Sequence, residues 1–302
     1  MSASISPVTG KRYGVELVCH IGGFPRSTYY ATRVGPGDPP PASSPKKRPA
    51  KRGPTTPMAD DELLQRIRED IQASPWKGEG HRKVHARLRR RGLCVGRKRV
   101  LRIMRENNLL SPHRCRCPNN ASHDGTIITE KPNEIWATDG TQTMTIEDGN
   151  VWIFAAIEHW NAECVGWHAS KSGNRFSALQ PIAMAIQEHY GSPCPGIARG
   201  LSLRMDHGCQ YTSDAFQQQI KNWGIAASFA LVGQPETNGV AERFFRTLKE
   251  QIIYGRVFQN LDELRQVIAG FVATYNSSWI LEKNGYTSPA EMRAAHQIRI
   301  AA

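Results

Sequence analysis

The sequence predicts an α/β protein in which a five-stranded mixed sheet with flanking helices follows all-α segments. Three observations lead to this fold class. Basic side chains and helical periodicity dominate residues 1–131, runs typical of strands begin at residue 134, and helical periodicity returns after residue 239. The 302 residues are enough for two or three domains.

Charge is distributed unevenly along the chain. Residues 1–131 contain 26 basic and 11 acidic side chains, whereas residues 132–302 contain 13 and 16. A concentrated positive charge favours a polyanionic partner, because each neutralised phosphate releases bound counterions. The first half of the chain is therefore expected to bind nucleic acid.

Several classes of protein are not expected. The longest wholly apolar run is the seven residues 151–157, well short of the roughly 20 that span a bilayer. The N-terminus has no charged-then-apolar signal pattern. Seven scattered cysteines indicate reduced thiols and not a disulfide framework. We expect a soluble cytoplasmic protein with no membrane partner.

The first 57 residues contain a short helical pair and a linker. Residues 1–33 are compatible with a small helix-turn-helix-like segment around Gly22 and Gly23, although a non-binding helical hairpin fits almost as well. Residues 34–57 hold eight of the 19 prolines together with a cluster of lysines and arginines. Such a stretch cannot form a packed core and is predicted to be an extended basic linker.

Residues 58–112 have a stronger helical pattern and are predicted to form a basic helix-turn-helix domain. Glycines at 80 and 92 separate the helical stretches, and eleven lysines and arginines fall within residues 82–105 with very few acids among them. We expect contacts to DNA phosphates or grooves. The predicted contact residues are Arg82, Lys83, Arg87, Arg90, Arg97, Lys98, Arg99 and Arg102. Residues 113–131 are expected to be a connector.

Residues 132–295 are predicted to form the sheet and the helices packed on it. The expected strands are 134–144, 151–159, 164–171, 200–206 and 225–231, and the expected helices are 175–189, 213–223, 239–256 and 261–277. Three antiparallel strands followed by alternating helices and strands is the plan of a ribonuclease-H-like sheet.

Three acidic residues occupy informative places in this plan. Asp139 interrupts an apolar or hydroxyl run inside the first strand, Asp206 ends the fourth strand, and Glu242 lies near the start of a helix. Arg246 and Lys249 follow at four and seven residues, on the same helix face. Taken singly, Asp139 could be a turn former, Asp206 a loop cap and Glu242 a favourable charge near a helix N-terminus.

Taken together, the three carboxylates suit phosphodiester chemistry. Such chemistry uses metal ions to activate the attacking oxygen and stabilise the leaving one, and Mg²⁺ prefers a few carboxylate oxygens while keeping bound waters. Positive side chains beside the carboxylates would approach the phosphate. The sequence therefore predicts a catalytic magnesium site at Asp139, Asp206 and Glu242.

Three motifs carry a resemblance to a known family. W-A-T-D-G-T at 136–141, M-D-H-G-C-Q-Y-T-S at 205–213 and N-G-V-A-E-R-F-F-R-T-L-K at 238–249 resemble the integrase-core transposases of bacterial insertion sequences, in particular the second-reading-frame proteins of the IS-three group. The resemblance implies a DDE transposase that cuts DNA and transfers strands. It also implies two Mg²⁺ ions on the three carboxylates, with Mn²⁺ as a substitute, and Lys249, Arg246, His207 and Asn238 beside the substrate DNA.

The resemblance further implies partners. The expected partners are double-stranded DNA, both as the element's terminal repeats and as the target, and the first-reading-frame protein of the same element. The protein is also expected to form a homo-oligomer and to be associated with the nucleoid. One departure is Trp279-Ile280-Leu281, where the family usually has Arg-Pro-His. That departure favours one alternative, a DNA-binding regulator with an inactive core. Another alternative is a nuclease that acts on RNA–DNA hybrids.

Overall fold

The computed structural model describes residues 4–31, 58–112, 127–230 and 238–301. The chain divides into two compact units, residues 1–55 and 56–302. The predicted linker, 34–57, and most of the predicted connector, 113–131, lie outside the described residues. None of the helices in the described ranges combines the length and the apolar character needed to cross a membrane.

The first unit contains two short helices, α1 (Val15–Ile21) and α2 (Arg26–Ala31). Gly23, with φ +66°, lies in the turn between them, where a residue without a side chain costs least. The backbone N–H of Phe24 donates to the carbonyl of Cys19 and closes the turn. This short helical pair agrees with the pattern expected around Gly22 and Gly23.

The second unit begins with a helical module, residues 58–112, that has a hydrophobic core of its own. It consists of α3 (Asp60–Ala73), α4 (His81–Arg90) and α5 (Arg97–Glu106). Apolar side chains at helical spacing in the sequence are buried together, among them Leu63, Ile67, Val84, Leu88, Val100 and Met104. The helical periodicity of the sequence therefore identified the module's core.

A five-stranded mixed sheet forms the centre of the remaining chain. Its strands are β1 (Ile135–Thr145), β2 (Gly149–Glu158), β3 (Cys164–Ser170), β4 (Ser202–Met205) and β5 (Ala226–Phe229). They are arranged in the order β3-β2-β1-β4-β5. The first three strands are antiparallel, whereas β4 pairs in parallel with both β1 and β5. The predicted ribonuclease-H-like fold is confirmed.

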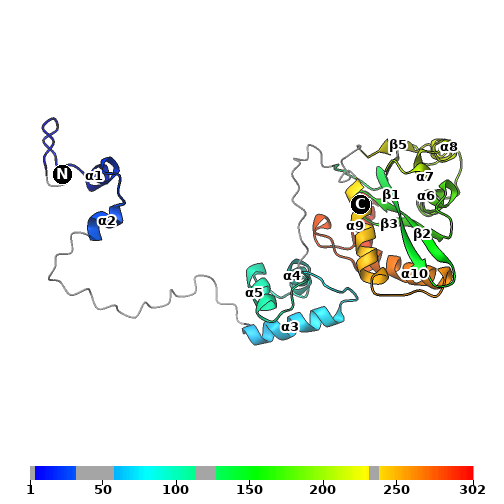
Figure 1. Cartoon of the computed structure of the whole chain (residues 1–302), viewed down its shortest axis with the longest axis horizontal. Coiled ribbons are helices and arrows are strands. Elements are labelled where there is room, and N and C mark those ends of the chain that lie inside the picture. The colour runs from blue at the N-terminus through cyan, green and yellow to red at the C-terminus, as the bar shows by residue number, and fades with distance from the viewer. Residues whose placement is uncertain (1–3, 32–57, 113–126, 231–237, 302) are drawn as a thin grey trace. The chain divides into compact units, whose positions relative to one another are not determined.

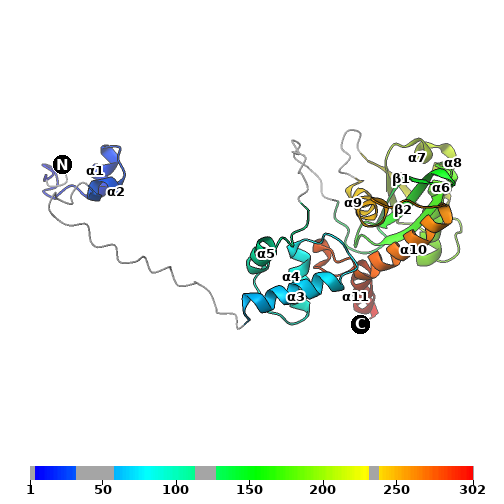
Figure 2. The ribbon, with the colours of Figure 1, turned by 60° about the horizontal axis from the view of Figure 1, so that its bottom comes forward.

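Helices cover both faces of the sheet (Figures 1 and 2). One face packs against α6 (Arg175–His189), α7 (Cys209–Thr212) and α8 (Asp214–Asn222), around Phe154 and Trp136. The other face packs against α9 (Gly239–Leu248) and α10 (Leu261–Ser278), around Phe244 and Phe271. Side chains on both faces of β2 lie against helices, and this explains why residues 151–157 of that strand are apolar without interruption.

The helix expected over 239–256 changes its winding part-way. After Leu248 the chain continues as a π-helical turn, η2 (Lys249–Ile253). Such turns are rare and often occur at functional sites. The chain ends with a 3-10 turn, η3 (Glu282–Asn284), and with α11 (Pro289–Ala301).

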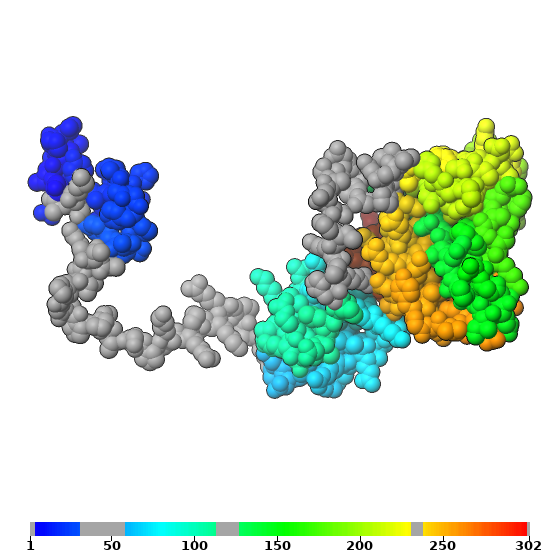
Figure 3. Space-filling view, viewed as in Figure 1, coloured from blue at the N-terminus to red at the C-terminus, as the bar shows by residue number. Residues whose placement is uncertain are grey.

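One side chain of the helical module belongs to the hydrophobic core of the sheet domain. Trp76, in the loop between α3 and α4, is 7% exposed and lies in the same cluster as Phe244, Leu248 and Phe271. Figure 3 shows the cyan surface of the module continuing into the orange surface of the core. Residues 58–112 and 132–295 are thus packed into one unit.

Candidate active site

The sheet brings the two predicted catalytic aspartates to the same place. In the parallel pairing of β1 with β4, Ala137 lies opposite Arg204. Two residues further along the same register, Asp139 is level with Asp206, which directly follows the last residue of β4. The parallel register therefore makes neighbours of two residues that are 67 positions apart in sequence.

Asp139 is largely removed from water. Its Oδ1 accepts a hydrogen bond from the backbone N–H of Gly140 at 2.7 Å. Gly140 packs against the ring of Phe154, and a Cβ there would lie 2.6 Å from a ring carbon. The pKa of Asp139 is raised to about 6, first by burial and then by the charges of Asp206 and Glu242, while the Gly140 N–H and Lys249 act in the opposite direction.

Asp206 lies in a tight turn after β4. Its Oδ1 accepts from the backbone N–H of Gly208 at 2.9 Å. A Cβ on Gly208 would approach that same oxygen to 2.9 Å, so a glycine is needed for the carboxylate to fold onto the turn. The neighbouring His207 is hydrogen-bonded through Nε2 to the carbonyl of Ala230 at 2.9 Å and stacks on Phe229.

Glu242 approaches the aspartates from α9. The first turn of this helix is fixed to β1 by Asn238, whose Nδ2 donates to the carbonyl of Thr138 at 3.2 Å. Asn238 is only 5% exposed, so it positions the helix from beneath the surface. Because the charge of Glu242 raises the pKa of Asp139, the two carboxylates lie within electrostatic range of each other.

Two positive side chains accompany the carboxylates on the same helix. Lys249 is half-buried, and its charge lowers the pKa of Asp139, which places the ammonium near that carboxylate. Arg246 is exposed one helical turn earlier. The structure therefore groups Asp139, Asp206, Glu242 and Lys249, and leaves Arg246 accessible beside them.

Tyr211 is a neighbour of the site that the sequence interpretation did not single out. It is fully buried in α7. Burial raises its pKa well above the ordinary value, and the nearby charge of Asp139 adds to the effect. The available signal was its place in the motif at 205–213, five residues after Asp206.

Most of the basic residues predicted to contact DNA have acidic partners in the fold. Asp70, which is fully buried, and Glu79 both bind Arg87, while Asp60 binds Arg99 and Arg102. The expectation that these bases lack acidic partners was wrong, because the acids lie outside residues 82–105. Arg97 and Lys98 are exposed and make no ion pair within the described residues.

The outward-facing sides of α4 and α5, the two helices that carry the basic residues of the module, have different surroundings. The outer face of α4 lies against the core: Arg82 pairs with Glu282, Arg90 pairs with Glu291, and the ammonium of Lys83 lies 3.0 Å from the ring centre of Trp279. The outer face of α5 is open to solvent and carries Lys98, Arg102 and Arg105. Of these two helices, α5 offers the exposed basic surface.

Comparison with known proteins agrees with this architecture. Residues 129–235 and 211–279 match two models described as integrase core domain, and residues 58–116 match an HTH-like domain. Residues 58–279 of this chain thus contain an HTH-like domain followed by an integrase core domain. The transposase for insertion sequence element IS629 of Shigella sonnei is 27% identical over 300 residues, which cover 96% of this chain and 95% of that protein.

Other similar proteins match a smaller share of this chain. The transposase InsD for insertion element IS2A/D/F/H/I/K of Escherichia coli is 27% identical over 241 residues, covering 77% of this chain and 78% of that protein. Among solved structures, a simian T-cell lymphotropic virus intasome is similar with a TM-score of 0.41 at 16% identity, over 67% of this chain and 66% of that one. The HTLV-2 integrase catalytic core domain in complex with magnesium gives a TM-score of 0.37 at 15% identity, over 54% and 97%.

The donor atoms in the integrase core suit a hard cation. Carboxylate oxygens on two adjacent strands and a neighbouring helix are the ligands that Mg²⁺ prefers. The mutual repulsion that raises the pKa of Asp139 is a repulsion that a bound cation would relieve. Within the described residues, no three acidic, histidine or cysteine side chains already form a complete ligand set. The residues fit the ion in their chemistry.

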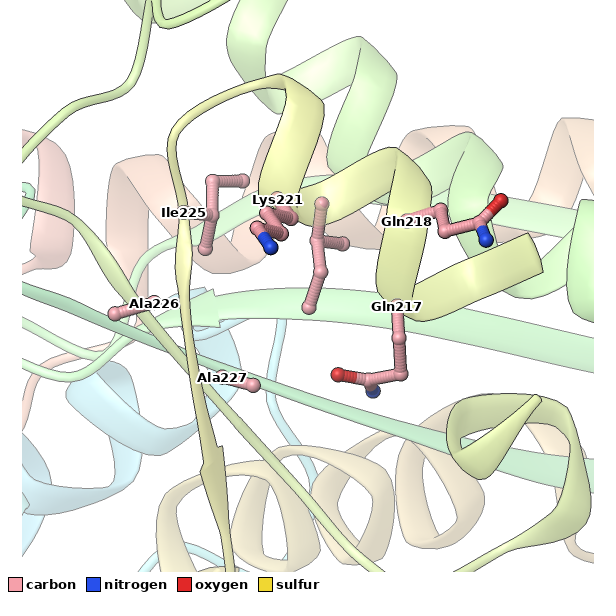
Figure 4. Close-up of a pocket in the computed structure, with 7 residues that line it drawn as sticks. Gln217, Gln218, Lys221, Ile225, Ala226 and Ala227 are labelled. Atoms are coloured by element: carbon pink, nitrogen blue, oxygen red, sulfur yellow. The ribbon is translucent and has the colours of Figure 1, made fainter. Parts of the chain in front are cut away.

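A separate hollow on the integrase core lies between α8 and β5. It is lined by residues from these two elements and the turn between them, including Gln217, Lys221 and Ala226 (Figure 4). None of the three carboxylates lines it. Its exposed Lys221 therefore provides a useful reference residue outside the candidate site.

Proposed function

We propose that this protein is a DNA transposase that binds the ends of an insertion sequence and catalyses metal-dependent DNA cleavage and strand transfer. The supporting observation is the meeting of Asp139 and Asp206 on adjacent strands, with the charge of Glu242 acting on Asp139 from α9. The IS629 transposase, which matches 96% of this chain, agrees with this proposal.

Each residue of the site has a task in this reaction. Asp139, Asp206 and Glu242 hold two Mg²⁺ ions, or Mn²⁺ in their place. When bound, these ions activate the attacking oxygen and stabilise the leaving oxygen of an in-line displacement. Lys249 and Arg246 bind phosphate oxygens beside the carboxylates. Asn238 and His207 hold α9 and the turn after β4 in position.

The helical module supplies the affinity for duplex DNA. We place the DNA-facing surface on α5, with Lys98, Arg102 and Arg105, because the outer face of α4 lies against the core. A homo-oligomer that holds both ends of the element, and the first-reading-frame protein, are the partners we propose. The departure at Trp279 is accounted for by its contacts with Trp76 and Lys83, at the interface between the module and the core.

A strand-transfer assay tests the reaction. The substrate is a labelled duplex carrying the terminal inverted repeat that adjoins the protein's own coding sequence, incubated with Mg²⁺ or Mn²⁺. Asp139→Asn, Asp206→Asn and Glu242→Gln preserve side-chain size but remove a ligand charge. We expect cleavage and joining to fall by orders of magnitude while binding of the end persists.

The matched control is Glu188→Gln, which neutralises an exposed carboxylate on α6 and should leave joining unchanged. Joining by Glu242→Gln at the parent rate would show that the assigned carboxylates are not the catalytic ones. A parent protein that binds ends and never cuts them would be a regulator. Cleavage of an RNA–DNA hybrid in place of the duplex would make it a hybrid nuclease.

A further inference from the structure

A cluster of positive side chains lies on the sheet face that carries the two aspartates of the candidate site. Its first member is Arg204 of β4. Leu203 and Met205 pack among α6, α7 and α8, and side chains alternate between the two faces of a strand. Arg204 therefore points to the opposite face, toward α9. Asp206 follows two residues later, about 7 Å further along the chain.

His159 shares this face with Arg204. It directly follows β2, and its backbone N–H donates to the carbonyl of Ile135 at 2.9 Å. Ile157, two residues earlier, packs among α9 and α10, so His159 is directed to the same side of the sheet. The pKa of His159 is lowered to about 4, first by burial and then by the charges of Lys283 and Arg204. Both cations are thus within electrostatic range of this ring.

The position of Lys283 is fixed by the short turn η3. Its ammonium donates to the carbonyl of His159 at 2.8 Å. The residues on either side of it are anchored as well. Glu282 forms an ion pair with α4 at 2.7 Å, and the buried Asn284 donates through Nδ2 to the carbonyl of Asn161 at 2.8 Å. The fold therefore holds this ammonium at the end of β2.

Arg243 adds a further positive charge from α9, directly after Glu242. Its charge acts on Lys283, whose pKa is lowered to about 8, first by burial and then by this repulsion. Arg243 and Lys249 are six residues apart, so their side chains point about 120° apart around the helix axis. The cluster is therefore on a different side of α9 from the lysine that acts on Asp139.

Carboxylates do not neutralise the two outer members of this cluster. Arg243 is exposed, and in the part of the chain that the structure describes neither it nor Lys283 forms an ion pair. Glu158, whose charge acts on Lys283, is fully buried. It lies on the other face of β2, where it accepts from the indole N–H of Trp136 and pairs with Arg293. Positive groups that repel one another in this way favour a bound anion, because the anion relieves the repulsion.

We propose that Lys283 and Arg243, with Arg204 beside them, form a binding site for a DNA phosphate other than the one that reacts. The proposal rests on the transposase function proposed above. Phosphate oxygens accept strong hydrogen bonds from ammonium and guanidinium groups. Both the element end and the target DNA present such phosphates at the sheet face that holds the aspartates, and two assays separate these sources.

Binding of the element end by the full-length protein is the first assay. The probe is the labelled duplex that carries the terminal inverted repeat, titrated in EDTA at several salt concentrations. If the site holds the end, Lys283→Ala and Arg243→Ala should each lower the slope of log affinity against log salt by about one. The double variant should lose little more than either single variant, because both side chains bind the same phosphate.

Strand transfer from a pre-cut end into a plasmid is the second assay. If the site holds target DNA, end binding should stay at the parent level in both variants. The KM for the plasmid should then rise about tenfold, with kcat near the parent value, because a lost charge-assisted bond weakens binding of the target. An unchanged salt slope together with an unchanged KM in both variants would overturn the proposal.

Two further variants separate a phosphate contact from other effects. Lys283→Arg keeps the charge and should restore the parent behaviour in both assays. Its guanidinium also stays charged at high pH, so the affinity of the parent should fall relative to Lys283→Arg between about pH 7 and 9. Lys221→Ala, at the hollow of Figure 4, removes an exposed lysine elsewhere and should change neither assay. A loss in Lys283→Ala that Lys283→Arg does not restore would indicate a structural role and overturn the assignment.

The outcomes also distinguish this proposal from the proposed function. If Glu242→Gln abolishes joining while Lys283→Ala and Arg243→Ala match the parent in both assays, only the phosphate site fails. If the parent protein neither binds nor joins the end, the transposase function fails and the phosphate site fails with it.

Discussion

Replacing Asp139 by asparagine should stabilise the metal-free protein at neutral pH. Asp139 has a pKa raised from 3.8 to about 6 by burial and by the charges of Asp206 and Glu242. A difference of this size corresponds to at most about 3 kcal/mol of folding free energy once the carboxyl is ionised. The neutral amide still offers an oxygen to the N–H of Gly140, so most of the hydrogen bonding is kept.

The direction of the pH dependence follows from the raised pKa. Below about pH 4 the carboxyl is protonated in both the folded and the unfolded chain, and it imposes no penalty. As the pH rises through about 6, the folded protein must release a proton that it binds more tightly than the unfolded chain does, so stability is lost. Asp139→Asn lacks this loss, so its advantage over the parent should grow between about pH 4 and 7.

Urea denaturation in EDTA at a series of pH values measures this difference. Adding Mg²⁺ at pH 7 should stabilise the parent, because ligand binding to the folded state adds to stability, and should stabilise Asp139→Asn much less. Glu188→Gln, which removes an exposed carboxylate on α6, is the control and should follow the parent at every pH. Parallel pH profiles for the parent and Asp139→Asn would refute the placement of Asp139 among partly buried carboxylates.

Three other measurements test the packing. Trp76→Ala should cost about 3–5 kcal/mol in urea denaturation, and a loss below about 1 kcal/mol would mean that Trp76 is not part of the core. Asp70→Asn removes the buried negative charge that Arg87 and Arg91 share, and leaves Arg87 with Glu79 alone; it should cost about 3 kcal/mol, whereas the exposed Asp262→Asn should stay within about 0.5 kcal/mol. In the native protein, a thiol reagent should label Cys94, Cys194 and Cys209, and should label the buried Cys164 only after unfolding, as followed by peptide mass mapping; burial also raises the pKa of Cys164.

The fold class was predictable because its signals are local. The apolar run at 151–157 indicates a strand covered on both faces, and the alternation of strands and helices after residue 171 limits the possible sheet orders. The convergence of Asp139 and Asp206 then follows from the parallel pairing of β1 with β4. That Glu242 and Lys249 share a helix face follows from their spacing of seven residues.

The rest depends on contacts between distant parts of the chain. The basic segment 82–105 looks unpaired in sequence because Asp60, Asp70, Glu282 and Glu291 lie outside it. Local patterns also cannot show that Trp76 joins the sheet domain's core and not the module's own core. The π-helical turn at Lys249 leaves the apolar stripe of α9 nearly unchanged, so periodicity did not reveal it.

The burial of Trp76 also sets a limit on how such proteins can be recombined. A chimera that joins the helical module of one relative to the sheet domain of another would place a foreign residue against Trp279, Phe271 and Ser278. A crossover between residues 112 and 132 separates these partners even though it avoids every helix and strand that the structure describes. A crossover ahead of Met58 keeps them together. For exchange of the proposed end-binding specificity, the unit that can be moved intact is therefore residues 56–302, and specificity within it is better altered on the outer face of α5, where we propose that DNA binds.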